Sequence, residues 1–509
     1  MSFIILKDTP IGYEENTTGG LHNMSDFYIK ANRVFTPWRK YAWIFTLTVA
    51  IGGLWFPKLG LLVIPVMIGL TSVSFFKGRY WCGNICPHGS LFDSFLYPIT
   101  NNKKIPSFLK SKILGIAFFT FFAINLGRKF VSVSALWGTM KFWDRLGFIF
   151  VASYLMVTVV GGVSSLIFSS RTWCNFCPMG TLQKISYKLG TVLGLNKKTD
   201  EKVTARHTDM CHLCGKCSRV CPMQLTPYLD LSEDNQLNDI NCIRCSTCVE
   251  NCPADILSLS TSGEAKEIKK SVDLTGYKKR KEFPATIHSI NKVNDTTNEY
   301  VFKFESNYIN YESGQFILIK IQNDPEMFRA YSISDFDSEN KTITVDIKKM
   351  ENGYGTEIIF NTFKEGDKVY LQGPIGHELL IDKNADEVVL VAGGIGITPF
   401  KAIVKDLVNN EHSINKFTLV YGANYQDEFM FDEEFKNYEK LSNKFKYRKV
   451  VAFDKDYDGD KGFVTDVLKK MDLKDNKIYM CGPPPMTKAA EKLLLDMNVP
   501  STDISYESA

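Results

Sequence analysis

Two cysteine runs constrain what this chain can fold into more tightly than any other feature. Residues 211–222 read CHLCGKCSRVCP and residues 242–253 read CIRCSTCVENCP, so each run spells Cys-x2-Cys-x2-Cys-x3-Cys-Pro. Thiolates at this spacing wrap a [4Fe–4S] cluster, and the fourth cysteine of each run serves the other cluster. Two complete copies weigh strongly against zinc, which a lone Cys-x2-Cys pair also suits. The expected ligand sets are Cys211, Cys214, Cys217 and Cys252 for one cluster, and Cys242, Cys245, Cys248 and Cys221 for the other.

A second cysteine signature occurs twice further upstream. Residues 79–91 read RYWCGNICPHGSL and residues 171–182 read RTWCNFCPMGTL, and each follows an apolar run. We expect the four thiols to meet on a pseudo-twofold axis and hold a third iron–sulfur cluster, each repeat supplying half of the site. A zinc site, or cysteines that only cap helices, are the alternatives. The cysteines concerned are Cys82, Cys86, Cys174 and Cys177.

Arginine and tryptophan residues accompany both copies of this signature. Arg79 and Arg171 either offset the negative charge of bound thiolates or anchor the chain at the inner membrane face, and the sequence does not separate the two. Trp81 and Trp173 are expected at the membrane interface, where indole rings gather.

The segment that carries this signature has the composition of a membrane domain. Residues 27–199 contain twenty Lys or Arg but two acids, and four runs without charge lie at 41–57, 59–76, 113–127 and 146–168. A membrane helix needs about 20 such residues. Fifteen basic residues fall on one side of the four runs and five on the other, which puts both termini in the cytoplasm. We therefore predict a four-helix transmembrane bundle in a bacterial cytoplasmic membrane; buried helices of a soluble protein are the alternative.

In combination these features resemble the membrane polyferredoxins of the nitrate- and nitrous-oxide-reductase accessory systems, over roughly residues 35–258. The resemblance implies two transmembrane hairpins followed by a two-cluster ferredoxin. One departure concerns the second repeat, where Cys174 and Cys177 are separated by two residues instead of three. The ligand role of Cys174 is therefore less secure than that of Cys82.

The C-terminal part of the chain changes to a strand-rich pattern. Residues 316–322 and 342–347 alternate at period two, which predicts a small antiparallel β-barrel. Residues 386–400 read DEVVLVAGGIGITPF, a buried strand that meets a glycine turn and then a helix. Such a turn cradles phosphate at the helix N-terminus. Further strand-like runs at 416–422, 447–453 and 477–486 predict a doubly wound α/β domain around a parallel sheet.

Four short motifs make residues 282–509 resemble the ferredoxin–NADP reductase superfamily: RAYS at 329–332, NGYGT at 352–356, GGIGITP at 393–399 and CGPPPM at 481–486. The resemblance implies that Arg329 holds the FAD pyrophosphate, that Tyr331 stacks on the flavin and that Ser332 faces its N5 atom. The remaining residues that it assigns to the FAD and nicotinamide dinucleotide are Gly353, Gly355, Thr356, Gly393, Gly394, Gly396, Thr398, Pro399, Gly482 and Pro483.

Three further residues complete this nucleotide site. Cys481 would lie beside the nicotinamide, unless it is an ordinary buried cysteine, and Glu507 takes the place of the family's near-terminal acid. No aromatic residue follows Glu507, so one face of the flavin is expected to be more open. Asp454 is expected near the adenosine ribose, where an acid repels a 2′-phosphate and accepts from a hydroxyl. NADH is therefore favoured over NADPH, and Ser332, Cys481 and Glu507 are the catalytic candidates.

These patterns divide the chain into six parts. They are an N-terminal cytoplasmic segment (1–35), a four-helix transmembrane domain (36–200), a ferredoxin domain (201–260), a charged, solvated linker (261–281), an FAD-binding barrel (282–384) and an NAD(P)-binding domain (385–509). FAD converts the electron pair of NADH or NADPH into single electrons for iron–sulfur clusters. The order predicts a membrane oxidoreductase that passes electrons to the membrane-face site and on to a quinone or a partner redox protein.

Other outcomes stay open at this stage. The chain is alternatively an accessory redox supplier or cupric reductase for another metalloenzyme, or it carries electrons in reverse from a low-potential donor to NAD. None of the seven histidines lies inside a predicted span, which excludes paired-histidine haem ligation in the membrane. His88 either serves a quinone or is a hydrogen-bonding surface residue. A homodimer remains open, and nucleic acid is not expected as a partner.

Overall fold

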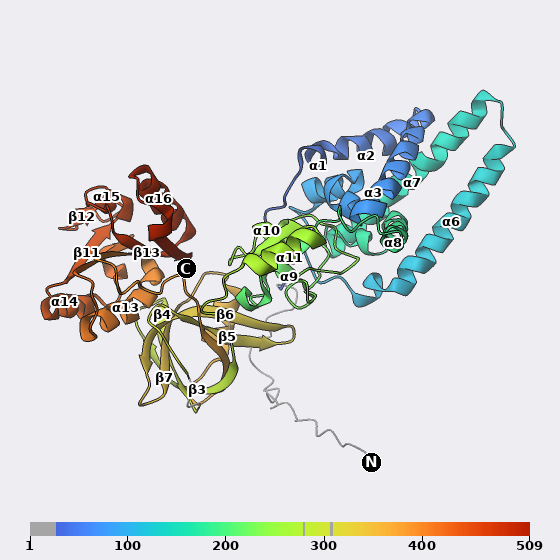
Figure 1. Cartoon of the computed structure of the whole chain (residues 1–509). Helices are drawn as coiled ribbons and strands as arrows, with labels where there is room; N and C mark the ends of the chain where they lie inside the picture. Colours follow the sequence, from blue (N-terminus) through green and yellow to red (C-terminus); the bar gives the residue numbers. More distant parts are fainter. Residues whose placement is uncertain (1–26, 278–279, 306–308, 509) are drawn as a thin grey trace, which may run out of the picture.

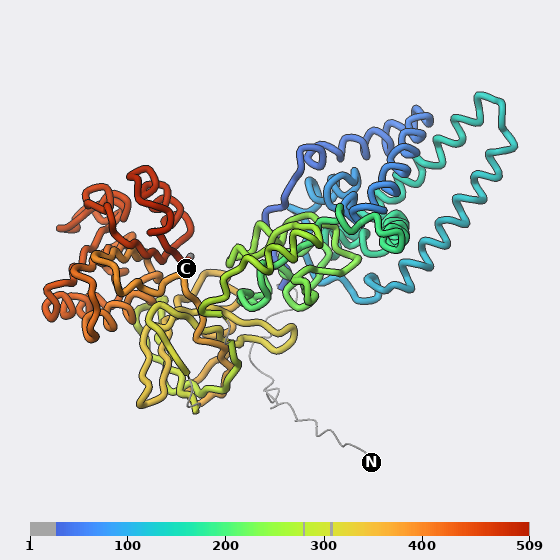
Figure 2. Tube along the Cα trace, in the orientation of Figure 1, coloured from blue at the N-terminus to red at the C-terminus, as the bar shows by residue number. Residues whose placement is uncertain are grey.

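The computed structural model describes residues 27–277, 280–305 and 309–508. The predicted N-terminal cytoplasmic segment therefore lies mostly outside the described residues. Figure 1 shows a helical part at one end, the ferredoxin-type segment in the middle, and the β-barrel with the parallel sheet at the other end. The trace in Figure 2 follows the same order, with the green ferredoxin segment lying against both neighbours. Parts that are consecutive in sequence are thus also neighbours in space.

Three helices are long and apolar enough to cross a membrane. They are Pro57–Lys77, which begins as a 3-10 turn and continues as α3 (Val63–Lys77), α6 (Lys112–Ser134) and α7 (Met140–Ile167). The first predicted span, at 41–57, is not a continuous helix. It is broken into α1 (Pro37–Tyr41), α2 (Trp43–Ala50) and a 3-10 turn at Gly52–Leu54. Paired glycines at 52 and 53 and the proline at 57 favour these breaks. The predicted four-helix bundle is therefore met by three membrane-length helices.

Helix α6 packs loosely compared with its neighbours. Only 6% of its most apolar window is buried inside the protein, against 39% for α7. Ile113, Ile116, Phe121 and Ile124 are all exposed on its surface. Outward-facing isoleucine and phenylalanine side chains without charge are typical of a lipid-facing helix.

The ferredoxin-type segment contains little regular structure. Strand β1 (Lys202–Ala205) pairs antiparallel with β2 (Leu257–Ser260), and α9 (Lys216–Arg219) and α10 (Thr247–Glu250) each lie inside one cysteine run. The two runs are therefore held between one short ribbon and the helical part. Helix α8 (Pro178–Val192) follows the second Cys-Pro motif and packs against α3.

The charged stretch that the sequence suggested as a solvated tether is partly folded. Helix α11 (Ser262–Ser271) begins with a capping box in which Thr261 and Glu264 bond each other's backbone. Tyr277 is buried, and its hydroxyl donates to Glu378 Oε1 at 2.9 Å. The linker prediction thus missed a capped helix and an aromatic anchor, because charge composition says nothing of either.

A closed antiparallel barrel follows, as the alternation in the sequence predicted. Its order is β3-β4-β7-β6-β5-β8, and helix α12 (Tyr354–Thr362) lies between β7 and β8 in sequence. The strands are β3 (Glu282–Lys292), β4 (Thr297–Phe304), β5 (Phe316–Asn323), β6 (Glu326–Asp337), β7 (Thr342–Lys348) and β8 (Lys368–Ile375). Inward-facing residues such as Ile287, Phe302 and Val345 are fully buried and form its core.

The last part is a six-stranded parallel sheet in the order β12-β11-β10-β9-β13-β14. The strands are β9 (Glu387–Gly393), β10 (Lys416–Ala423), β11 (Phe445–Val451), β12 (Asp460–Lys461), β13 (Lys477–Gly482) and β14 (Ile504–Ser508), and the helices are α13 (Thr398–Asn409), α14 (Asp432–Leu441), α15 (Val464–Leu468) and α16 (Pro484–Asp496). The strand order reverses between β9 and β13, which is where open α/β sheets bind ligands. The predicted doubly wound architecture is present.

Candidate functional site

A cavity of about 620 Å³ lies where the barrel, the parallel sheet and the ferredoxin-type segment meet. The predicted flavin and catalytic residues that line it are Arg329, Tyr331, Ser332, Thr356, Thr398, Cys481 and Glu507. They come from β6, from the start of α12 and α13, and from β13 and β14. The structure thus brings together, around one space, residues that are up to 178 positions apart in sequence. The size and the mixed polar and aromatic lining fit a flavin nucleotide.

The predicted glycine turns border this cavity. Gly393, Gly394 and Gly396 form the turn from β9 into α13, and Pro399 is among the first residues of that helix. Gly482 and Pro483 form the matching turn from β13 into α16. Gly353 and Gly355 lie at the start of α12. Asp454 follows β11 on the same edge of the sheet, and its Oδ1 accepts from the Asp456 N–H at 3.1 Å.

Two carboxylates in the cavity lack partners. Glu507 Oε1 is buried without a hydrogen bond among the described residues, as are both carboxylate oxygens of Asp346. Burial, together with the charge of Glu378, raises the pKa of Glu507 to about 8. Burial also raises the pKa of Asp346 to about 6. The sequence analysis missed Asp346, because a single acid in an alternating strand is usually on the outer face.

The first cysteine run docks directly on the wall of this cavity. Arg329 Nη1 donates to the Cys214 carbonyl at 2.8 Å, and the Phe328 N–H donates to the Leu213 carbonyl at 3.1 Å. Arg280 Nη1 donates to the Cys211 carbonyl at 2.6 Å. Cys214 itself lines the cavity. The strand that carries the flavin motif is therefore fastened to the loop that carries the first cluster ligands.

The fourth cysteine of each run lies with the other run, as predicted. Cys221 lines one small cavity with Cys242, Cys245 and Cys248. Cys252 interacts electrostatically with Cys214 and with Cys211. Burial raises the pKa of Cys221 to about 12 and of Cys211 to about 11, so these thiols ionise readily only when a cation such as iron binds them. Within the described ranges, no three His, Cys, Asp or Glu side chains form a single-ion site.

The second run in turn docks on the first Cys-Pro motif. Cys245 packs with Cys82 and Cys174 in one buried cluster. Asn84 Nδ2 donates to the Arg244 carbonyl at 3.1 Å. Gly83 approaches the Ile243 carbonyl so closely that a Cβ at position 83 would lie 2.0 Å from its oxygen. Only glycine permits this contact between the helical part and the ferredoxin-type segment.

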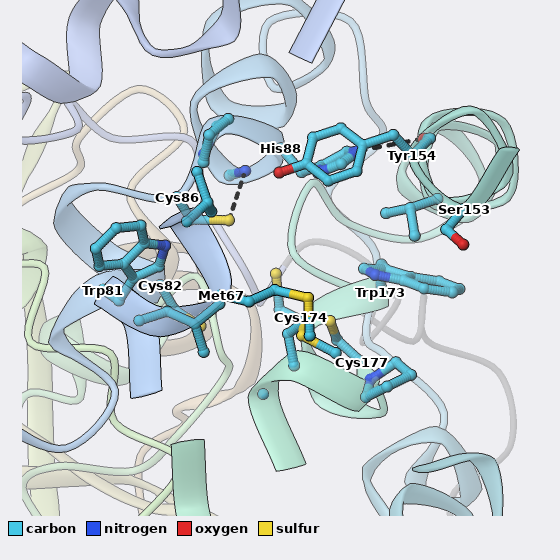
Figure 3. A pocket seen from close by; sticks show the side chains of 18 of the residues that line it. Met67, Trp81, Cys82, Cys86, His88, Ser153, Tyr154, Trp173, Cys174 and Cys177 are labelled. Atoms are coloured by element: carbon cyan, nitrogen blue, oxygen red, sulfur yellow. Dashed lines mark hydrogen bonds between the residues drawn. The ribbon is translucent and has the colours of Figure 1, made fainter. Parts of the chain in front are cut away.

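All four cysteines of the Cys-Pro repeats line one cavity beneath α3 and α7 (Figure 3). Cys82 and Cys174 are buried, while Cys86 and Cys177 are partly buried. Cys86 and Cys177 each interact electrostatically with Cys82 and Cys174. The structure therefore brings the four thiols together in the arrangement that the repeat suggested.

Each repeat sends its arginine into the other. Arg79 Nη2 donates to the Cys174 carbonyl at 2.8 Å, and Arg171 Nη1 donates to the Cys82 carbonyl at 3.1 Å. The glycines of the two Cys-Pro-x-Gly motifs make room for these side chains. A Cβ on Gly89 would lie 2.3 Å from Arg171 Nη1, and one on Gly180 would lie 3.0 Å from Arg79 Nη2. The reciprocal contacts explain why arginine and glycine recur together in the signature.

The two arginines differ in what neutralises them. Arg171 forms a salt bridge with Asp93 at 2.6 Å, and Arg39 pairs with the same carboxylate. Arg79 forms no ion pair with a carboxylate in the part of the chain that the structure describes; it contacts Cys82 Sγ at 3.6 Å instead. A fully buried guanidinium beside four thiols fits an anionic tetrathiolate cluster. Of the two roles left open for these arginines, offsetting thiolate charge fits their burial and membrane anchoring does not.

Two expectations for this region were wrong. Trp173 is not an interfacial residue but is 2% exposed, packed against Phe118 and Phe176. His88 is not on the surface either: it is buried, its ring lies 4.5 Å from that of Tyr154, and its Nε2 lies 3.3 Å from Thr158 Oγ1. Helix α7 covers both, which the motif alone could not reveal.

Four family descriptions match the chain. "Oxidoreductase FAD-binding domain" matches residues 284–378 and "Oxidoreductase NAD-binding domain" matches residues 390–492. "4Fe-4S dicluster domain" matches residues 204–253, and "4Fe-4S binding domain" matches residues 59–106 and 151–196, one stretch for each Cys-Pro repeat. The predicted FAD, NAD and [4Fe–4S] cofactors are thereby confirmed.

Known relatives match only the FAD- and NAD-binding part. In Fusobacterium nucleatum, the electron transfer subunit of dihydroorotate dehydrogenase B (NAD(+)) is 34% identical over 200 residues, which covers 37% of this chain and 72% of that protein. In Idiomarina loihiensis, a subunit of the Na(+)-translocating NADH-quinone reductase is 28% identical over 210 residues, covering 38% of this chain and 51% of that protein. The chain thus spans about half the length of its relatives among the Na(+)-translocating reductases. An Amycolatopsis cytochrome P450 reductase structure covers 45% of this chain and 70% of its own at 20% identity, with a TM-score of 0.41.

Proposed function

Since this chain belongs to the ferredoxin-reductase-type family of FAD- and NAD-binding oxidoreductases, we propose that it carries electrons from NADH to the cytoplasmic face of a bacterial membrane. The route runs from the FAD cavity through the two cysteine runs to the four-cysteine site at the Cys-Pro repeats. From there electrons pass to a quinone or to a partner redox protein. The helical part is a multi-pass membrane domain with both termini in the cytoplasm, of the accessory polyferredoxin type.

One observation carries the proposal: the sites touch one another in sequence. The flavin-motif residue Arg329 bonds Cys214 of the first run, and Cys221 of that run lies with Cys245 of the second. Cys245 packs against Cys82 and Cys174. Each junction is direct, so no large motion of one part against another is needed to pass an electron along the chain.

The residues divide the work at the FAD end. Bound FAD accepts an electron pair from NADH and releases single electrons to iron–sulfur clusters. In this proposal Arg329 and Thr356 hold the FAD phosphates, Tyr331 packs on the ring system and Ser332 faces its reactive edge. Cys481, at the end of β13, places the nicotinamide against the same edge, and Glu507 lies beside it. The glycine turns after β9 and β13 receive the dinucleotide, with Asp454 reading the ribose.

The domain limits given above follow the same logic. The ferredoxin-type segment from 201 to 260 forms the junction between membrane and flavin parts, and residues 261–281 carry the chain from one to the other. Tyr277 lines the FAD cavity from this connecting stretch. The connection is therefore part of the flavin site instead of a passive tether.

Replacing Cys86 by Ser tests the route. We expect NADH to bleach the flavin and reduce the ferredoxin clusters as in the wild type, while one cluster's iron is lost and electron delivery to the membrane stops. The matched variant Cys177→Ser should behave identically, because both thiols line one cavity. Cys481→Ser should do the reverse and slow flavin reduction. Normal delivery by Cys86→Ser would exclude the membrane-face step.

A further inference from the structure

A cavity leads from the four cysteines into the helical part, and we propose that it binds the head group of an isoprenoid quinone. The proposal rests on the electron route proposed above and names its acceptor. The cavity lies between α3, α6 and α7, and Figure 3 shows Met67, Trp81 and Trp173 around its centre. No role has so far been given to this space or to Tyr154, which lines it.

The cavity is longer than the cysteine site alone needs. Its lining on α3 runs from Val63 to Leu70, which at 1.5 Å per residue is about 10 Å along the helix. Phe122 and Leu126 of α6 and Phe150 of α7 form the opposite walls. The cysteines mark one end of the cavity, and these residues extend it into the membrane domain, away from the ferredoxin-type segment.

The lining is suited to a neutral, largely apolar ring. Arg79 carries the only permanent charge on it among the described residues, and its guanidinium is already engaged by Cys82 and the Cys174 carbonyl. Nucleotides and other anions would find no free cation there. Trp81 and Trp173 offer flat faces for stacking, as aromatic rings do in ligand pockets.

A few polar groups gather at the cysteine end. Figure 3 shows Tyr154 beside His88, with its hydroxyl on the side of Cys86. The two rings are 4.5 Å apart, and His88 Nε2 lies 3.3 Å from both Thr158 Oγ1 and the Tyr154 carbonyl. Both side chains line the cavity. A quinone carbonyl at this end would find the Tyr154 hydroxyl as a donor within reach of the membrane-face thiols.

The loosely packed α6 gives such a ligand a way in from lipid. Its exposed residues Ile116, Phe121 and Ile124 face outward, while Phe122 and Leu126 face the cavity. An isoprenoid tail would lie along this helix, and the ring would enter beside it. In the reaction NADH and one proton reduce the quinone to quinol and leave NAD⁺; the ring gains two electrons, delivered singly, and two protons, one at each carbonyl oxygen.

Copper is the competing occupant. Met67, Met156 and Met179 line the cavity together with the cysteines, and thioether and thiolate sulfur select Cu(I). The aromatic walls and the length along α3 favour the quinone, because a metal ion needs neither. The experiment must therefore offer both acceptors.

Two substitutions on α3 separate the cavity from the lipid face. Val66 lines the cavity, whereas Ile68 is 63% exposed two residues further on. Val66→Phe should fill the space, and Ile68→Phe is the matched control. Menaquinone-1 binding to the oxidised protein in nanodiscs is read from quenching of tryptophan fluorescence. Reoxidation is read anaerobically, from the iron–sulfur absorbance of NADH-reduced protein after menaquinone-1 or Cu(II) is added.

We expect the wild type and Ile68→Phe to bind menaquinone-1 equally and to be reoxidised promptly. Val66→Phe should weaken binding and slow reoxidation at least tenfold, although NADH still reduces its clusters, and Tyr154→Phe should slow reoxidation more than it weakens binding. Equal binding by Val66→Phe and Ile68→Phe, or reoxidation by Cu(II) but not by menaquinone-1, overturns the proposal. If NADH reduces no cluster but menaquinone-1 binds as described, the proposed electron route fails and the quinone site stands.

Discussion

At the membrane-face site the buried Asp93 is held by two arginines, whereas in the FAD cavity Asp346 and Glu507 bury carboxylate oxygens without a hydrogen-bond partner among the described residues. Burial alone raises the pKa of Asp93, but Arg171 and Arg39 overcome this effect and hold it well below its ordinary range. In the cavity, burial raises the pKa of both acids towards neutrality. One end of the route therefore has fixed charges, and the other end has charges that change with pH.

The difference follows from what each site has to exclude. The membrane-face charges lie between helices, where an unpaired ion is costly, so each arginine is matched by a carboxylate or by thiols. The FAD cavity is open until a nucleotide fills it, and polar groups there wait for a ligand. Pairing at one end predicts sensitivity to mutation, and missing partners at the other end predict sensitivity to pH.

The strongest test of this contrast is Asp93→Asn. The amide leaves Arg171 and Arg39 without a counter-charge, and breaking a buried pair of this kind costs about 3–5 kcal/mol of unfolding free energy. Lys184 is the matched control, because it follows Gly180 by four residues as Asp93 follows Gly89. Lys184→Gln should change stability by less than about 1 kcal/mol. Chemical unfolding in detergent measures both, and equal losses would end the argument from pairing.

A smaller effect is expected from the two glycines that receive the arginines. A Cβ on Gly89 would lie 2.3 Å from the Arg171 guanidinium, which Asp93 holds in place, so Gly89→Ala should cost about 1–3 kcal/mol. Gly180→Ala places its Cβ 3.0 Å from Arg79, which is held by weaker partners, and should cost less. Iron content and the unfolding midpoint report the result. If Gly180→Ala proves the more harmful, Arg79 is the more rigid of the two arginines.

The pH dependence sharpens the other side of the comparison. The pKa of Glu507 rises from 4.5 to about 8 on folding because of burial and Glu378, so the folded state favours the protonated acid. Its contribution is complete below pH 4.5 and is lost as the pH rises through 8. Because the residue is partly exposed, we expect a loss on the order of 1–2 kcal/mol over this window.

Glu507→Gln should flatten that slope, and Asp496→Asn, an exposed change on α16, should leave it intact. Thermal unfolding between pH 4 and 9, roughly the span over which carboxylate titration matters here, measures all three proteins. An unchanged slope in Glu507→Gln would assign the effect to Asp346, whose raised pKa of about 6 lies in the same window.

Local spacing was enough to predict much of this molecule. The crossed cysteine sets, the closed barrel and the glycine turn at the sheet's switch point all follow from patterns within about a dozen residues. The reciprocal arginines could not be predicted in this way, because each contact joins positions about 90 residues apart and depends on how two helical hairpins pack. The burial of Trp173 and His88 has the same origin, since α7 covers both.

Other differences have more local causes. The first apolar run looked like a membrane span by composition, but its paired glycines break the helix into short pieces. Asp346 looked like an outer-face residue because strands alternate, and only the closed barrel shows that its side chain lines the FAD cavity. Composition and alternation fix which residues can be buried, whereas the packing of distant elements fixes which polar ones are.

The smallest expected effect concerns the choice of nucleotide. Asp454 follows β11 at the edge of the sheet where the dinucleotide is proposed to bind, and a carboxylate there repels a 2′-phosphate. Asp454→Arg should raise kcat/KM for NADPH relative to NADH about tenfold, or about 1.4 kcal/mol. Asp456→Arg places the same charge on the neighbouring residue whose N–H bonds Asp454, and should shift the ratio less. If both variants shift it equally, net charge and not a specific contact distinguishes the nucleotides; if neither does, another residue reads the ribose, and the FAD end depends on its surface charges as little as the membrane end does.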